Sequence, residues 1–162
     1  DGATAADDAR IGHVHLSVGD VATARAFYVD GLGWEPVDEV AGEVVFLQVG
    51  HGLLLSLWRR ADLLEEAGPG IHEAHHGPVP VVPVALAHNV GSPAEVDDVL
   101  ASALAAGGSV VVPAQVRAWG GYSGYFADPD GFRWEVAHNP GLVVSDDGRV
   151  TFVAAEPDPG AW

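Results

Sequence analysis

The feature that most constrains the fold of this chain is an internal repeat. Residues 13–20 align with residues 85–92, and a helical pattern follows each segment. Farther along, residues 46–57 align with residues 125–136, so that Ser56 stands opposite Glu135. Self-similarity of this kind indicates one supersecondary unit used twice. Two such units are expected to share a core and to form a cleft between them, where a ligand would bind.

The first repeat predicts a strand, a helix and about three further strands, two of which the residues locate. Residues 11–18 alternate as in a strand, with His13, His15 and Ser17 on one face. Asp20 is the expected N-cap of a helix that runs to about Asp30. Strands are predicted over residues 44–49 and 53–58, joined by a Gly-His-Gly turn, and a helix over residues 59–67.

The second repeat begins with an apolar strand over residues 84–90. Ser92 and Glu95 form a capping box with Pro93 at the first helical position, and two glycines at 107 and 108 end the helix. Further strands are expected over residues 110–112, 115–118, 124–127 and 132–137. The chain therefore divides into a disordered leader (1–10), a first module (11–70), a connector loop (71–83), a second module (84–140) and a C-terminal tail (141–162), with a short strand near 150–153.

Composition excludes several kinds of chemistry. The 162 residues contain no Cys, and all seven basic residues are Arg, so thiol nucleophiles and lysine Schiff bases are impossible. The formal net charge of -16 argues against nucleic acid and suits a cationic or neutral small ligand. A plain acidic, solvated surface explains the same charge. No apolar run is long enough to span a membrane, and the acidic start does not read as a signal peptide, so a cytoplasmic location is expected.

Short motifs carry a resemblance to a known superfamily. They are residues 11–14 leading to Asp20, residues 26–28, residues 31–34, the Asp-Pro-Asp-Gly hairpin within 124–131 and residues 134–136. Over residues 11 to 140 the chain resembles the vicinal oxygen chelate superfamily, which includes glyoxalase I, extradiol dioxygenases, fosfomycin-resistance enzymes and bleomycin-binding proteins. The resemblance implies an α+β fold in which two tandem βαβββ modules form a cup-shaped mixed sheet with helices outside.

The resemblance also assigns four metal-ligand positions, here His13, Ser56, Ala85 and Glu135. Serine is a poor ligand and alanine is none, so two of the four positions are lost. A set of His13, His15 and Glu135 could instead hold Fe, Mn, Ni or Zn. The alternative is that His15 lines a polar pocket while His13 hydrogen-bonds Glu135. The cofactor is therefore either absent or one divalent metal ion.

Other polar and aromatic residues are candidates for ligand binding. Trp58, Asn89 and Arg133 share the face of the ligand positions, and Trp119 and Tyr122 lie on a glycine-rich loop at the expected mouth of the cup. His88 is expected to face the helices as a structural histidine. The His-Glu-x-x-His match at residues 72–76 lies between glycine and proline residues that leave room for one helical turn, so a zinc protease site is rejected.

These observations predict a protein that binds a small organic molecule in the cup between its modules, with a degraded metal site. The alternative is a metal-dependent lyase, isomerase or dioxygenase that uses His13, His15 and Glu135. A third hypothesis is metal-free acid–base catalysis by His13 and Glu135. We expect no nucleic-acid or membrane partner, and the resemblance implies a homodimer.

Overall fold

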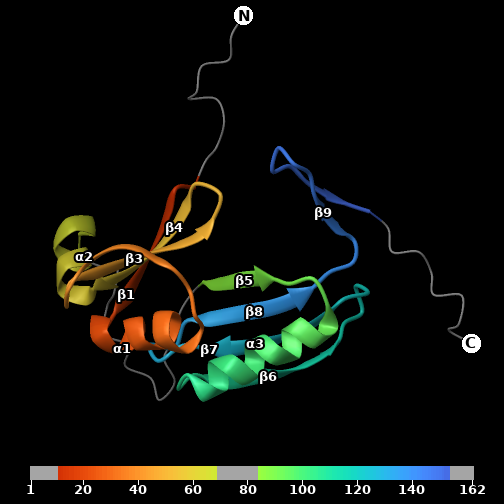
Figure 1. Ribbon diagram of the computed structural model, residues 1–162, viewed down its shortest axis with the longest axis horizontal. Helices are drawn as coiled ribbons and strands as arrows, with labels where there is room; N and C mark the ends of the chain where they lie inside the picture. Colours follow the sequence, from red (N-terminus) through yellow and green to blue (C-terminus); the bar gives the residue numbers. More distant parts are fainter. Residues whose placement is uncertain (1–10, 69–83, 154–162) are drawn as a thin grey trace, which may run out of the picture. The chain divides into compact units, whose positions relative to one another are not determined.

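The computed structural model describes residues 11–68 and 84–153. The chain separates into two compact units, residues 1–81 and 82–162, and each is described here by itself (Figure 1). The predicted leader, the connector and the end of the tail lie outside the described residues. None of the described helices is long and apolar enough to cross a membrane.

The first unit is a four-stranded mixed sheet with two helical segments. Its strands are β1 (His13–Val18), β2 (Pro36–Val40), β3 (Val44–Gly50) and β4 (Leu53–Arg59), in the order β1-β4-β3-β2. The helices are α1 (Val21–Arg25), which continues into a π-helical segment η1 (Ala26–Gly31), and α2 (Arg60–Ala67). β1 and β4 are parallel, and the other pairs are antiparallel.

Alternation along β1 separates a core face from a polar face. Leu16 and Val18 are buried beside Leu55 and Leu57 of β4, whereas His13 and His15 point to the other side. Asp20 caps α1 as predicted, because its side chain accepts hydrogen bonds from the Ala22 backbone N–H and the Thr23 hydroxyl.

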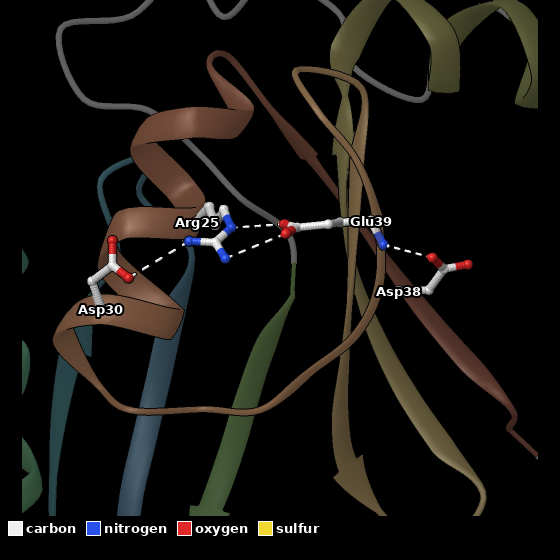
Figure 2. Close-up of polar contacts among 4 residues, drawn as sticks. All are labelled: Arg25, Asp30, Asp38 and Glu39. Carbon is white, nitrogen blue, oxygen red and sulfur yellow. Dashed lines mark hydrogen bonds and ion pairs between the residues drawn. The ribbon is translucent and has the colours of Figure 1, made fainter.

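An exposed ion pair ties α1 to the edge strand β2 (Figure 2). Arg25 binds Glu39 through two guanidinium nitrogens, at 2.7 and 3.3 Å, and lies 3.6 Å from Asp30. The Glu39 backbone N–H is held by Asp38. The hydrogen bond from Arg25 lowers the pKa of Glu39. The side chains of Arg25 and Glu39 are 35% and 40% exposed, so this solvent-accessible ion pair adds little to the stability of the unit.

The second unit repeats the arrangement around one long helix. β5 (Ala85–Asn89), β6 (Ser109–Val116), β7 (Tyr122–Ala127) and β8 (Arg133–His138) form a sheet in the order β5-β8-β7-β6. α3 (Pro93–Ala105) begins at Ser92, whose hydroxyl accepts the Glu95 backbone N–H, and it packs against β6, β7 and β8. The strand register confirms the repeat. Glu135 pairs with Ala87 in the second sheet, just as the aligned residue Ser56 pairs with His15 in the first.

A two-stranded hairpin follows the second sheet. β9 (Leu142–Val144) pairs with β10 (Val150–Phe152), close to the short strand predicted near 150–153. The register puts Leu142, Val144, Val150 and Phe152 on one face. Three of these side chains are exposed, so the hairpin presents an apolar surface in the described part of the chain.

The α+β class is confirmed by the two four-stranded mixed sheets and their helices. Three local predictions differ from the structure. The helix after Asp20 changes to π-helical geometry at Ala26, β2 was not predicted, and the two strands expected around Pro113 are the single strand β6 with register shifts.

Candidate functional site

A pocket lies within the first unit, on the face of the sheet that carries the two histidines of β1. Its volume is about 530 Å³. Its walls come from three strands and one helix: His13, His15, Phe46, Trp58, Leu63, Glu66 and Ala67. Of the predicted site residues, the structure therefore brings His13, His15 and Trp58 together.

The helix α2 forms one wall because of the spacing of its residues. Leu63, Glu66 and Ala67 are three and four positions apart, so they share one face of the helix. Leu63 is the buried anchor of that face, and α2 packs against β1 and β4. Burial of Leu63 therefore turns Glu66 toward the sheet and its two histidines.

Aromatic rings form the floor of the pocket. The His15 ring meets Trp58 edge to face at 5.0 Å, and the His13 ring meets Phe46 edge to face at 6.1 Å. The two imidazole centroids are 5.6 Å apart. His13 and Phe46 lie on strands separated by β4, roughly two strand spacings or 9.6 Å. Their rings therefore reach toward one another across β4.

The residue below these rings is Ser56. It pairs directly with His15 on one side and with Phe46 on the other, and its side chain is completely buried. Among the described residues its hydroxyl has no hydrogen-bond partner, and neither has that of Ser17 on the same face. A small residue at position 56 thus lets the rings close over β4 and leaves a buried hydroxyl unsatisfied.

The surroundings of His15 favour the neutral form of its imidazole. Burial is the main cause that lowers its pKa, and the charge of His13 acts in the same direction. Glu66 acts in the opposite direction, which places its carboxylate within electrostatic reach of His15. The pocket therefore contains a mainly neutral His15 near neutral pH, with the single carboxylate of Glu66 in the α2 wall.

Two of the four metal-ligand positions offer no good donor atom. Ser56 is covered, Ala85 has no donor atom, and the described residues contain no group of three or more His, Cys, Asp or Glu that could hold one. The smaller predicted set of His13, His15 and Glu135 draws on both units, so it stays a prediction. The same holds for direct pairing of His13 with Glu135.

Glu135 lies on a separate polar face in the second unit. Tyr125 pairs with Glu135 from β7, and its phenol donates a hydrogen bond to the Glu135 carboxylate. The pKa of this phenol is raised, mainly by burial and then by the negative charge of Glu135. The positive charge of Arg117 acts against this rise in the pKa of Tyr125. Arg117 is held by Ser123: its Nε donates to the Ser123 hydroxyl at 2.9 Å, and its Nη2 donates to the Ser123 carbonyl. The predicted catalytic carboxylate is thus held by a phenol from the neighbouring strand.

The other predicted ligand-binding residues are spread over the second unit. Tyr122 donates to Asp97 of α3 at 2.8 Å, so it lies on the helix-covered face, away from Glu135. Trp119 is about half exposed and its ring lies against Gly121, where an added Cβ would be 1.7 Å away. Asn89 is exposed on the edge strand, and Arg133 donates to the Gly131 carbonyl at 3.0 Å.

Two other histidine predictions have different outcomes. His88 pairs in register with the fully buried Val136, and burial lowers its pKa, in agreement with a helix-facing position. The His-Glu-x-x-His match at residues 72–76 lies outside the described residues.

Sequence reasoning missed Phe46, Leu63 and Glu66. The alternation of β3 was a usable signal for Phe46, since it shares parity with Ser56 across the strand pair. For α2, the sequence predicted the helix but carried no sign of which sheet face it covers.

Comparisons with known proteins agree with the architecture. Residues 10–136 match the family model of the Glyoxalase/Bleomycin resistance protein/Dioxygenase superfamily. A crystal structure of a glyoxalase-related enzyme from Fulvimarina pelagi is 37% identical, with a TM-score of 0.75, over 90% of this chain and 99% of that one. Lactoylglutathione lyase from Agrobacterium tumefaciens is 26% identical, with a TM-score of 0.59, over 82% and 95% of the two chains.

A curated relative matches over a shorter region. Catechol-2,3-dioxygenase of Bacillus subtilis is 41% identical over 56 residues, which are 32% of this chain and 20% of that protein. The match thus spans about a fifth of that relative's length. With the family model covering most of the repeat and two matched sheets of the same topology, the chain belongs to the Glyoxalase/Bleomycin resistance protein/Dioxygenase superfamily.

Proposed function

We propose that this protein binds a small organic molecule and that its first unit supplies an aromatic pocket for it. The observation that carries the proposal is the chain of rings over β4, where His13, His15, Phe46 and Trp58 line about 530 Å³. Rings at such spacing offer faces and edges to a planar ligand, and Leu63 adds an apolar wall. Two of the four metal-ligand positions that the resemblance assigns are lost, and this degraded site favours ligand binding over metal-dependent catalysis.

The test is a thermal-shift screen of planar aromatic compounds. A ligand that binds the folded state raises the melting temperature, and the stabilisation grows with the logarithm of the ratio of ligand concentration to Kd. Hits should lose most of their effect in a Trp58→Ala variant. Trp119→Ala is the matched control, because Trp119 is an exposed tryptophan outside the pocket lining. Equal stabilisation of the wild type and of both variants would contradict the proposal.

The second candidate function is a metal-dependent lyase, isomerase or dioxygenase using His13, His15 and Glu135. It is favoured by the 5.6 Å separation of the two imidazoles, and two relatives are named as a lyase and a dioxygenase. Metal analysis of protein purified without a nickel column tests it. Stoichiometric Fe, Mn, Ni or Zn that disappears in His13→Ala would favour this enzyme over the binding protein. A homodimeric state and a cytoplasmic location stay predictions.

A further inference from the structure

The charge of the pocket indicates which small molecules it selects. Among its seven lining residues, Glu66 is the only Asp, Glu, Lys or Arg. Two arginines lie where β4 meets α2: Arg59 is bound to Asp62 at 2.7 Å, and Arg60 is not part of the lining. The aromatic walls are therefore accompanied by one negative charge and by no fixed positive charge.

From this arrangement we infer that the ligand is a flat aromatic molecule with a cationic group, the ring lying against Trp58 and Phe46 and the cation facing Glu66. This inference rests on the proposed function and adds the ligand class. Aromatic faces attract cations through their quadrupole, and the Glu66 carboxylate adds a Coulombic attraction for the same cation. An anionic ligand would meet repulsion from both.

The position of Glu66 supports a binding role over a solvated surface charge. It is one turn beyond the buried Leu63, and its carboxylate acts electrostatically on His15. Its neighbour Glu65 is two positions from Leu63, which turns it to another side of the helix. Both glutamates are exposed, but Glu65 is not among the residues that line the pocket. Glu65 therefore carries the same charge in the same helix and serves as a matched control.

Equilibrium dialysis of two naphthalene derivatives tests the inference. Naphthalen-2-ylmethylammonium carries a cation, and naphthalen-2-ylmethanol is a neutral compound of nearly the same shape. We expect the wild type to bind the ammonium compound about three- to tenfold more tightly, the size of a partly screened interaction between unit charges. Glu66→Gln should remove that preference, Glu65→Gln should keep it, and added salt should weaken binding of the ammonium compound alone.

Failure of the ligand class and failure of the proposed function give different results. If both compounds bind the wild type equally, or if Glu65→Gln and Glu66→Gln reduce binding of the cation alike, the assigned class is wrong while an aromatic pocket still binds. If neither compound binds the wild type, or if both bind Trp58→Ala as well as they bind the wild type, the pocket itself is refuted.

Discussion

Replacing Ser56 by alanine should stabilise the protein. The Ser56 side chain is completely buried, and among the described residues its hydroxyl lacks a hydrogen-bond partner. A buried unsatisfied polar group costs about 1–3 kcal/mol. The substitution deletes one atom and leaves a small void that offsets part of the gain. We expect a net increase of about 1 kcal/mol in the free energy of unfolding, or about 2–4 °C in Tm for a chain of this size.

The matched control is Ser123→Ala in the second unit. Ser123 is as completely buried as Ser56, but its hydroxyl accepts a hydrogen bond from the Arg117 guanidinium at 2.9 Å. Losing a hydrogen bond to a charged group should cost about 1.5–3 kcal/mol. Urea unfolding of both variants, analysed with the wild-type m-value, measures the two changes. If Ser56→Ala destabilises the protein as much as Ser123→Ala does, the rings do not leave that hydroxyl unsatisfied and the description of the pocket floor is refuted.

Three further predictions concern other parts of the chain. The pKa of His15 is lowered in the folded state, so on acidification the unfolded chain takes up a proton at His15 before the folded chain does. The free energy of unfolding should therefore be retained above pH 6.5 and fall below it. Urea unfolding at pH 5.5 and 7.5 should show a smaller loss for His15→Asn than for the wild type. Gly124→Ala should cost about 1–3 kcal/mol by overpacking, because the new Cβ would lie 2.9 Å from the Val112 carbonyl; an unchanged Tm would contradict this. Light scattering should give twice 16.8 kDa, and Phe152→Ser, which makes the exposed hairpin face polar, should shift the mass toward one chain; a monomeric wild type would contradict the homodimer.

Much of the fold followed from local signals in the sequence. Asp20 and Ser92 cap their helices as expected, since a side-chain acceptor at that position satisfies free backbone N–H groups. β2 gave no such signal, because it is a short edge strand that begins with Pro36 and leaves four of its five residues exposed. Pro113 suggested a break between two strands, but an edge strand tolerates proline and β6 continues through it.

The candidate site was predictable only as far as strand alternation reaches. Alternation put His13, His15 and Trp58 on one face, and the structure gathers them in one pocket. The contribution of α2 was beyond such reasoning, because one buried leucine in an eight-residue helix fits either face of a sheet. Docking of that helix is a tertiary event, and it is what brings Glu66 to the rings.

The two units show how one backbone register can give two different surfaces. Equivalent rows of three paired residues cross the sheets: His15, Ser56 and Phe46 in the first unit, and Ala87, Glu135 and Tyr125 in the second. In the first row the middle residue is small, so the flanking rings cover it and make an aromatic floor. In the second row the middle residue is a carboxylate with alanine on one side, so it stays partly exposed and takes its hydrogen bond from the phenol. The repeat thus preserves the positions of the site residues, whereas the order of side-chain sizes across each row decides whether a position becomes a covered aromatic pocket or an open acidic face.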